Sequence, residues 1–288
     1  AWNLTDSHMM RIMTALAAVL MTLSAMAAPK SYDLVSPDGR LKLHIDMEDG
    51  LEYSLEHDGD LLMEKSHLGM YMTDGTVFGG IQPVRKATRR SVSQTIPAVI
   101  YRKSVVKDEF NELTLKFNKF SVIFRAYDDG VAYRFLSHLK GQYNVELEMA
   151  DFGFPEDWNA WTAYVAQHTE TLESQYYNSF ENQYAYAPLS QWNKERLAFL
   201  PLLVDGPDGK KIAITDADLL NYPGMYLYNE GSDTSLEGRF APYPKDVQQG
   251  GHNMLQMVVK SGEPYIARCE GATQFPWRVI AVSEKDVQ

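Results

Sequence analysis

Apolar and polar residues alternate along most of the chain after residue 30, in segments of five to seven positions. A period of two is the pattern of a β-strand with one face buried. Alternation is clearest in 41–47, 51–56 and 112–117, and short strand-like segments continue at 121–127, 131–136, 200–204, 211–215, 254–259 and 277–282. Turn sequences such as Asp49-Gly50 and Asp205-Gly206-Pro207-Asp208-Gly209 separate neighbouring segments and favour antiparallel hairpins.

Helical spacing is scarce in this sequence. Residues 216–222 are spaced for one or two helical turns before Pro223-Gly224 ends them. Many short strands with frequent turns favour a sandwich over units of alternating strand and helix. No internal repeat or flexible linker divides the chain. The sequence therefore predicts an all-β fold, a large antiparallel β-sandwich with few short helices, formed by residues 29–288.

The amino terminus differs from the rest of the chain. Residues 1–9 have the character of an expression leader, and residues 10–28 that of a secretory signal peptide. Arg11 supplies the positive start, residues 12–24 the apolar centre and Ala25–Ala28 the small-residue end. The apolar run is short for a membrane span. We expect an exported, periplasmic protein with no membrane span in the mature chain.

Charge and cysteine content exclude several classes of function. The formal net charge is −11 and the pI is near 5.1, which argues against nucleic acid or an anionic membrane as a partner. Cys269 is the only cysteine, so neither an intramolecular disulfide nor a cysteine zinc cluster can form. Phosphate-binding glycine loops, paired zinc histidines and the Gly-x-Ser-x-Gly motif are also absent from the sequence.

The stretch from Ser174 to Ser190 combines aromatic, amide and hydroxyl side chains around one carboxylate, Glu181, and contains no Lys or Arg. Aromatic faces and amides suit a sugar, which offers apolar C–H patches and a rim of hydroxyls. A carboxylate in this setting is either exposed or held by a metal, and calcium is the cation that prefers such oxygens. The alternative is a half-buried strand with Glu181 simply solvated.

Other candidate residues are less informative. Trp158 and Trp161 suit either a sugar-stacking platform or the core of a sandwich. The seven histidines are scattered and are expected at surface or capping positions. Glycoside hydrolysis requires two carboxyl groups on either side of the scissile bond. No spacing in this sequence identifies such a pair.

Four blocks together resemble the N-terminal domain of glycoside hydrolase family 97, which contains α-glucosidases and α-galactosidases of Bacteroidetes-type bacteria. The blocks are Ser36-Pro37-Asp38-Gly39-Arg40-Leu41 with Leu68-Gly69; Asn111-Glu112-Leu113 through Asp129-Gly130-Val131-Ala132-Tyr133-Arg134-Phe135; Glu181-Asn182-Gln183-Tyr184 with Leu189-Ser190 and 216–225; and 276–283. Each block alone is weak, but their order and spacing cover nearly all the mature chain.

The resemblance implies a β-super-sandwich that packs against a downstream (β/α)8 catalytic barrel with a calcium ion in its active site. In this family one glutamate of the sandwich reaches that ion, and Glu181 matches its position. The acid and base lie on the barrel, so no catalytic residue is expected in this chain. Tyr177, Tyr184 and Trp192 are candidates for contacts with the substrate.

The resemblance therefore predicts the N-terminal domain of an exo-acting, calcium-dependent α-glucosidase or α-galactosidase. Its partners are an oligosaccharide with α-linked glucose or galactose and the barrel of the same polypeptide. Alone, the chain should have no turnover and bind calcium weakly or not at all. Glucoside or galactoside preference, linkage, oligomeric state and inverting or retaining chemistry stay open.

Two other functions are compatible with the sequence: a free-standing carbohydrate-binding sandwich and a purely structural interaction domain. A sandwich that packs against a barrel should present one large apolar face. A lectin-like module should instead show a compact aromatic groove. The surface of the folded chain therefore distinguishes between them.

Overall fold

The computed structural model describes residues 30–100, 102–166, 171–177, 180–231 and 234–285. The predicted leader (1–9) and signal peptide (10–28) lie outside these residues. Within the described ranges, no helix has the length and apolar character needed to cross a membrane.

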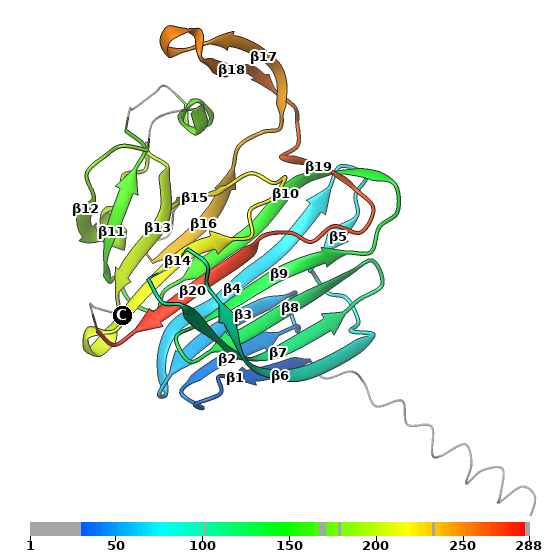
Figure 1. The fold of residues 1–288 in the computed structure, drawn as a ribbon, viewed down its shortest axis with the longest axis vertical. Coiled ribbons are helices and arrows are strands. Elements are labelled where there is room, and N and C mark those ends of the chain that lie inside the picture. The colour runs from blue at the N-terminus through cyan, green and yellow to red at the C-terminus, as the bar shows by residue number, and fades with distance from the viewer. Residues whose placement is uncertain (1–29, 101, 167–170, 178–179, 232–233, 286–288) are drawn as a thin grey trace, which may run out of the picture.

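The described residues form twenty strands and four short 3-10 helices, and all strand pairs are antiparallel (Figure 1). The strands are β1 Ser31–Val35, β2 Leu41–Asp46, β3 Glu52–His57, β4 Asp60–Met72, β5 Val77–Phe78, β6 Lys86–Pro97, β7 Val105–Lys116, β8 Phe120–Tyr127, β9 Gly130–Ser137, β10 Gln142–Gly153, β11 Asn159–Tyr164, β12 Ala185–Pro188, β13 Ala198–Asp205, β14 Lys211–Ala217, β15 Met225–Tyr228, β16 Ser235–Phe240, β17 Pro244–Gly250, β18 Gln256–Gly262, β19 Ala267–Glu270 and β20 Trp277–Ser283. The helices are η1 Glu173–Tyr177, η2 Leu189–Gln191, η3 Pro207–Gly209 and η4 His252–Met254.

The strands pair into two layers. The first layer runs β1–β2–β3–β4–β10, with β5 on β4 and β19 on β10. The second runs β6–β7–β8–β9–β20–β14–β13–β11–β12. Strands β15 and β16 connect β13 to β10 and so join the layers at one end. The hairpin β17–β18 projects from the body as an arm (Figure 1).

The predicted all-β class is confirmed, and most predicted segments are strands. The hairpins of 41–47 with 51–56 and of 200–204 with 211–215 form as β2–β3 and β13–β14. The helical turns predicted at 216–222 are wrong. Strand β14 continues to Ala217, and Asp218 and Asn221 then adopt left-handed backbone angles. The Asp218 carboxylate accepts a hydrogen bond from Arg134, and this tertiary contact outweighs local helical spacing.

The core lies between the two layers and follows the alternation of the strands. On β2, Leu41, Leu43 and Ile45 are buried, while the residues between them are half-exposed. Aromatic rings fill the space near the β4–β5 end, where Phe120 stacks on Phe78 at 4.8 Å and on Phe117 at 4.4 Å between ring centroids. Burial of each such side chain contributes on the order of 1.5–3 kcal/mol.

One ion pair is fully buried between the layers. Arg278 of β20 is 1% exposed and donates two hydrogen bonds of 2.7 Å to the carboxylate of Glu148 on β10. Burial alone would lower the pKa of Arg278, but the Glu148 charge outweighs burial and raises it. The rings of Phe240 and Tyr222 cover the guanidinium at 5.1 and 5.9 Å. The pair therefore connects the second layer to the first through an apolar core.

Removal of one partner of this pair should destabilise the protein strongly. Glu148→Leu removes both short hydrogen bonds of the buried Arg278 guanidinium and leaves the Asp216 carboxylate, 3.6 Å away, as its counter-charge. We therefore expect the free energy of unfolding to fall by about 3–5 kcal/mol, measured by urea denaturation. Arg40→Met, which removes the half-exposed ion pairs of Arg40 with Asp58 and Glu284, should cost much less. The double variant Glu148→Leu with Arg278→Met should recover much of the loss. Equal losses for Glu148→Leu and Arg40→Met would contradict this assignment.

A second charged cluster holds the long β6–β7 hairpin to β8. Glu112 of β7 accepts hydrogen bonds from Arg90 of β6 at 2.6 and 2.8 Å and from Arg125 of β8 at 2.9 Å. The Arg125 guanidinium lies 4.2 Å from the centroid of Phe110. Burial alone would raise the pKa of Glu112, but the two arginines outweigh burial and the pKa is lowered.

This lowered pKa makes the cluster sensitive to acid. The contribution of Glu112 is fully present above the ordinary carboxyl value of 4.5 and is lost as the pH falls through its lower pKa in the folded state. Glu112→Gln should therefore be less stable than the wild type at neutral pH. The difference should shrink below pH 4.5, as followed by thermal unfolding. Glu146→Gln, at an exposed position of β10, is the control. A difference that stays constant with pH would contradict the assignment.

Candidate functional site

The predicted Glu181 stretch lies in the connection between β11 and β12, at the edge of the second layer. Gln175 of η1 is fully buried and fixes the start of this connection. Its side-chain amide donates to the carbonyl of Glu195 at 2.7 Å and accepts from the amide of Leu197 at 2.9 Å. Because both ends of the Gln175 side chain are satisfied, the described part of the connection has a defined position.

Aromatic rings attach the same segment to the sheet. The ring of Tyr176 lies 5.2 Å from that of Tyr226 on β15, and Phe180 lies 5.2 Å from Phe199 on β13. Burial raises the pKa of Tyr176 and raises that of Tyr226 to about 12, so both phenols stay neutral at physiological pH. The backbone around Glu181 therefore rests on a small apolar cluster.

Glu181 itself is exposed and lies between two anchored neighbours. Phe180 packs on β13 on one side, and the side-chain amide of Asn182 donates to the carbonyl of Tyr164 at 3.0 Å on the other. These contacts leave the Glu181 carboxylate at the surface. A surface carboxylate on a fixed backbone is able to act as an oxygen ligand for a hard cation.

A calcium ion at Glu181 would need further ligands. One carboxylate provides at most two of the six to eight oxygens that calcium takes. In the part of the chain that the structure describes, the ligand-type side chains that form a group of three are His57, Asp58 and Glu284, not Glu181. The residue chemistry at Glu181 thus fits an ion whose other oxygens come from carbonyls, amides, water or a second segment.

The three predicted sugar-contacting residues differ in accessibility. Tyr177 and Tyr184 are 47% and 49% exposed, whereas Trp192 is 5% exposed. Tyr177 lines a hollow of about 810 Å³ together with Tyr222 and Tyr243. The Trp192 indole packs edge-on against Tyr164 at 5.3 Å, so its position in the core gives no support to direct stacking of a sugar.

The two tryptophans near β11 also lie in different environments. Trp158 packs edge-on against Phe154 at 6.1 Å. Trp161 is exposed, and its ring lies 4.5 Å from that of Tyr186 on β12. The Tyr186 hydroxyl donates to the carboxylate of Asp205 at 2.7 Å. The exposure of Trp161 follows from the alternation of β11, in which the residues on either side of Trp161 are buried.

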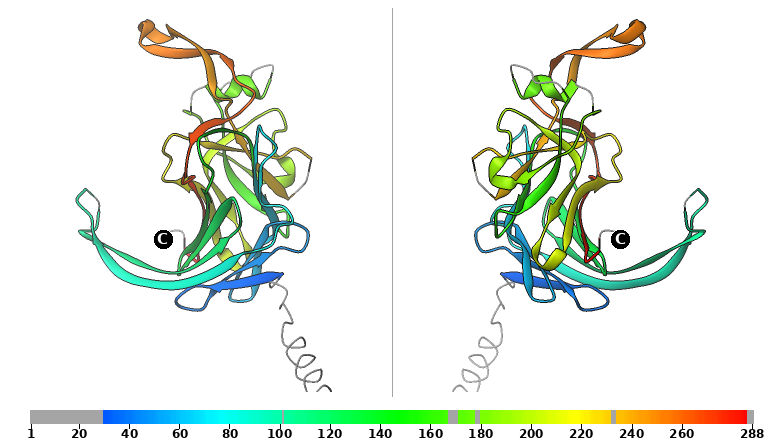
Figure 2. Two further views of the ribbon diagram at one scale, coloured as in Figure 1. Left: turned by 90° about the vertical axis from the view of Figure 1, so that its right-hand side faces the viewer. Right: turned by 90° about the vertical axis from the view of Figure 1, so that its left-hand side faces the viewer.

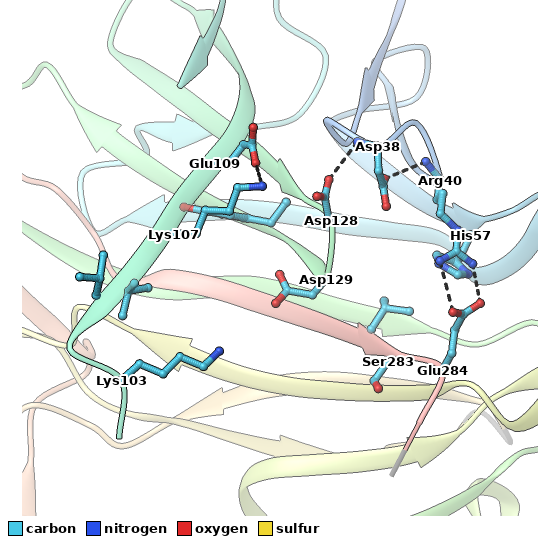
Figure 3. A pocket seen from close by; sticks show the side chains of 14 residues that line it. Asp38, Arg40, His57, Lys103, Lys107, Glu109, Asp128, Asp129, Ser283 and Glu284 are labelled. Carbon is cyan, nitrogen blue, oxygen red and sulfur yellow. Dashed lines mark hydrogen bonds and ion pairs between the residues drawn. The ribbon is translucent and has the colours of Figure 1, made fainter. Parts of the chain in front are cut away.

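A charged hollow of about 610 Å³ was not foreseen from the sequence (Figure 3). It is lined by the start of β7, the turn between β8 and β9, the end of β20 and residues 38, 40 and 57 of the first layer. Arg40 donates to both Asp58 and Glu284 there, and these hydrogen bonds lower the pKa of each carboxyl. Residues 40, 58 and 284 are far apart in the sequence, so spacing could not group them. Because Arg40 already neutralises the two carboxylates, the group with His57 is an ion-pair cluster and carries no metal assignment.

Comparisons with known proteins agree with this fold. The family model "Glycosyl-hydrolase 97 N-terminal" matches residues 34–288. A retaining alpha-galactosidase from Bacteroides thetaiotaomicron is 44% identical over 273 residues, which cover 94% of this chain and 41% of the relative. The chain thus spans about two-fifths of the length of that enzyme.

Solved structures of longer enzymes share the fold. A Glycoside Hydrolase Family 97 enzyme from Pseudoalteromonas sp. strain K8, solved in complex with acarbose, superposes with a TM-score of 0.70 at 23% identity, covering 88% of this chain and 36% of that one. A beta-arabinopyranosidase gives a TM-score of 0.71 at 22% identity, with 88% and 40% covered. At this identity the structures support the fold alone. The family model and the 44% identical relative show that this chain belongs to glycoside hydrolase family 97, as its N-terminal domain.

Proposed function

We propose that this chain is the N-terminal domain of an exo-acting, calcium-dependent α-glycosidase and that it completes the active site of a downstream (β/α)8 barrel. The family assignment supports the domain's place in such an enzyme. The name of the 44% identical relative favours an α-galactoside as substrate and a retaining reaction. An α-glucoside is the alternative. We further propose that the enzyme acts in the periplasm after export directed by residues 10–28.

The observation that carries this proposal is the exposed Glu181 on an anchored connection. Phe180, Asn182 and the buried Gln175 fix the backbone while the Glu181 carboxylate stays at the surface. A bound calcium ion would supply a concentrated positive charge for carboxylate and sugar hydroxyl oxygens. In this proposal Glu181 contributes one ligand, and barrel residues contribute the others.

Tyr177 and Tyr184 would form part of the wall of the sugar pocket. Both rings are exposed on the same connection as Glu181 and are able to cover the apolar face of a pyranose. Their role would be to position the sugar and exclude water. The proton transfers belong to carboxyl groups of the barrel.

Glu181→Gln in the full-length enzyme tests the metal role. The amide keeps the size of the side chain and removes its charge, so we expect a rise of tenfold or more in the calcium concentration needed for half-maximal activity on an aryl α-galactoside, in line with the roughly 10–100-fold effects of altered metal sites. Glu173→Gln, an exposed glutamate on the same connection, is the matched control. Wild-type calcium dependence in Glu181→Gln would remove this residue from the site.

The chain by itself gives a second test. Calorimetric titration of the 288-residue chain should show no calcium binding at micromolar concentration, since Glu181 alone offers too few ligands. The same titration with galactosides and glucosides tests the alternative of a free-standing carbohydrate-binding module, which the exposed Trp161–Tyr186 pair favours. Sugar binding that is lost in Trp161→Ala would support that module. Micromolar calcium binding would contradict the shared site.

A further inference from the structure

An open hollow of about 810 Å³ lies at the base of the β17–β18 arm. Figure 2 shows that the arm leaves the body at the end opposite the long β6–β7 hairpin, which curves so that the outer face of the second layer is concave. Four segments that are far apart in the sequence meet at the hollow. They are Tyr177 of η1, residues 220–223 between β14 and β15, residues 241–244 where the arm begins, and several residues of 266–274. The volume lies within the range of about 300–1,000 Å³ that is typical of small-ligand sites.

Tyrosine rings form much of the apolar lining of this hollow. The ring of Tyr222 packs edge-on against Phe275 at 5.4 Å, and that of Tyr243 lies 5.6 Å from Tyr265. These contacts fix two of the three rings. The third, Tyr177, is 47% exposed and borders the hollow from the connection that carries Glu181. An accessible ring of this kind is able to cover the apolar C–H face of a pyranose.

One cation with a fixed position borders the hollow. The Arg268 guanidinium lies 5.1 Å from the ring centroid of Tyr243 and donates a hydrogen bond of 2.7 Å to the hydroxyl of Tyr265. Arg268 forms no ion pair with any residue that the structure describes. A guanidinium has five N–H donors, so most of those on Arg268 are available to a ligand.

Three polar side chains line the same hollow with unused hydrogen-bonding groups. They belong to Asn221, Glu270 and Gln274, and each of these residues is exposed. None of the three side chains forms a hydrogen bond with another described residue. Two amides and a carboxylate therefore face solvent beside the Arg268 guanidinium.

Strand β10 adds two more amides on the other side of Arg268. Gln142 and Asn144 line a second hollow of about 380 Å³, which Arg268 also borders. In the pairing of β10 with β19, Asn144 lies opposite Arg268 and Gln142 lies opposite Glu270. These two amide side chains also lack hydrogen bonds within the described ranges. Unused polar groups thus continue from one hollow to the next.

The β6–β7 hairpin shows a different arrangement of exposed polar side chains. There Ser91 donates to Asn111 at 2.6 Å, and Gln94 donates to Asp108 at 2.7 Å, across the two strands. Cross-strand pairs of this kind stabilise a sheet. Around Arg268, in contrast, the amides and the carboxylate are left for groups outside the domain.

The chemistry of these side chains suits a neutral ligand with many hydroxyl groups. A hydroxyl donates to carboxylate and carbonyl oxygens and accepts from amide and guanidinium N–H groups. An anion fits less well, because the carboxylates of Glu270 and Asp74 border the two hollows and outnumber the guanidinium of Arg268. The group of three metal-ligand side chains found among the described residues lies elsewhere.

We propose that the hollow around Arg268, at the base of the arm, binds a saccharide. Tyr177 and Tyr243 cover the apolar face of a sugar ring, while Arg268, Asn221 and Gln274 bind its hydroxyls. The choice of a sugar among hydroxyl-rich ligands rests on the function proposed above. All of these groups belong to this domain, so the 288-residue chain should bind the sugar by itself.

Ligand-observed NMR titration of the 288-residue chain tests this site with melibiose, an α-galactosyl disaccharide, and maltose, an α-glucosyl disaccharide. Arg268→Ala removes the guanidinium from an exposed strand position. Asn221→Gly removes an amide, and glycine accepts the left-handed backbone angle of this residue, φ 54°, without strain. Arg89→Ala, at an exposed position of β6, is the matched control. Thermal unfolding shows that each variant is folded.

We expect at least one disaccharide to bind. Arg268→Ala should weaken this binding by a factor of about ten or more, because hydrogen bonds to a charged group are lost, while Arg89→Ala should change it by less than a factor of about two. Asn221→Gly should give a smaller loss than Arg268→Ala. Equal binding by the wild type and Arg268→Ala overturns the proposal. Binding that is lost in Trp161→Ala and kept in Arg268→Ala assigns the sugar to the aromatic pair of β11 and β12 and also overturns it.

Two further outcomes separate this site from other ligands and from the function proposed above. Tighter binding of inorganic phosphate than of either sugar assigns the hollow to an anion and overturns the proposal. An active full-length enzyme together with a 288-residue chain that binds neither disaccharide overturns the saccharide site alone. Sugar binding that depends on Arg268, in a full-length enzyme without α-glycosidase activity, refutes the proposed function and supports the site.

Discussion

The central constraint on this domain is the packing of its second layer on the first across one apolar core. The inner face packs on the first layer, where Ile212, Ile214 and Ile280 are buried. The outer face carries Ala213, Val279 and Ala281 on the same two strands. The same outer face carries the ion pair of Lys211 with Asp205 and the hydroxyl of Ser283, so apolar and charged positions share it.

The position of Glu181 is consistent with this constraint. Its connection joins β11 to β12, and these strands form the edge of the same layer. The buried pair of Arg278 and Glu148 connects this layer to the first one.

Much of the fold could be predicted from local alternation, because strands such as β2, β8 and β20 bury every second residue. The prediction of helical turns at 216–222 was wrong because Arg134, from a distant strand, binds Asp218. The polar strand β6 shows little alternation and was missed. The Arg278–Glu148 pair joins residues 130 positions apart, which no local pattern reveals.

Part of the candidate site could be predicted from the sequence. The composition of the stretch from Ser174 to Ser190 and the family resemblance both selected Glu181, and its exposure agrees with a role at a surface. Trp192 was chosen by type alone, and its burial depends on the ring of Tyr164. Segment 277–282 is apolar at every position except Arg278, whereas 211–215 has the polar residues Lys211 and Thr215 at its ends. That the domain presents one large apolar face to a barrel stays a prediction of the resemblance.

A structure of the full-length enzyme with calcium is the most direct test of the central claim, that this domain offers a metal ligand and an apolar face to the rest of its own polypeptide. The account predicts a Glu181 oxygen within about 2.3–2.6 Å of the ion and protein atoms packed against Ala281 and Ala213. A solvent-filled concave face, with the Glu181 carboxylate remote from any ion, would contradict it.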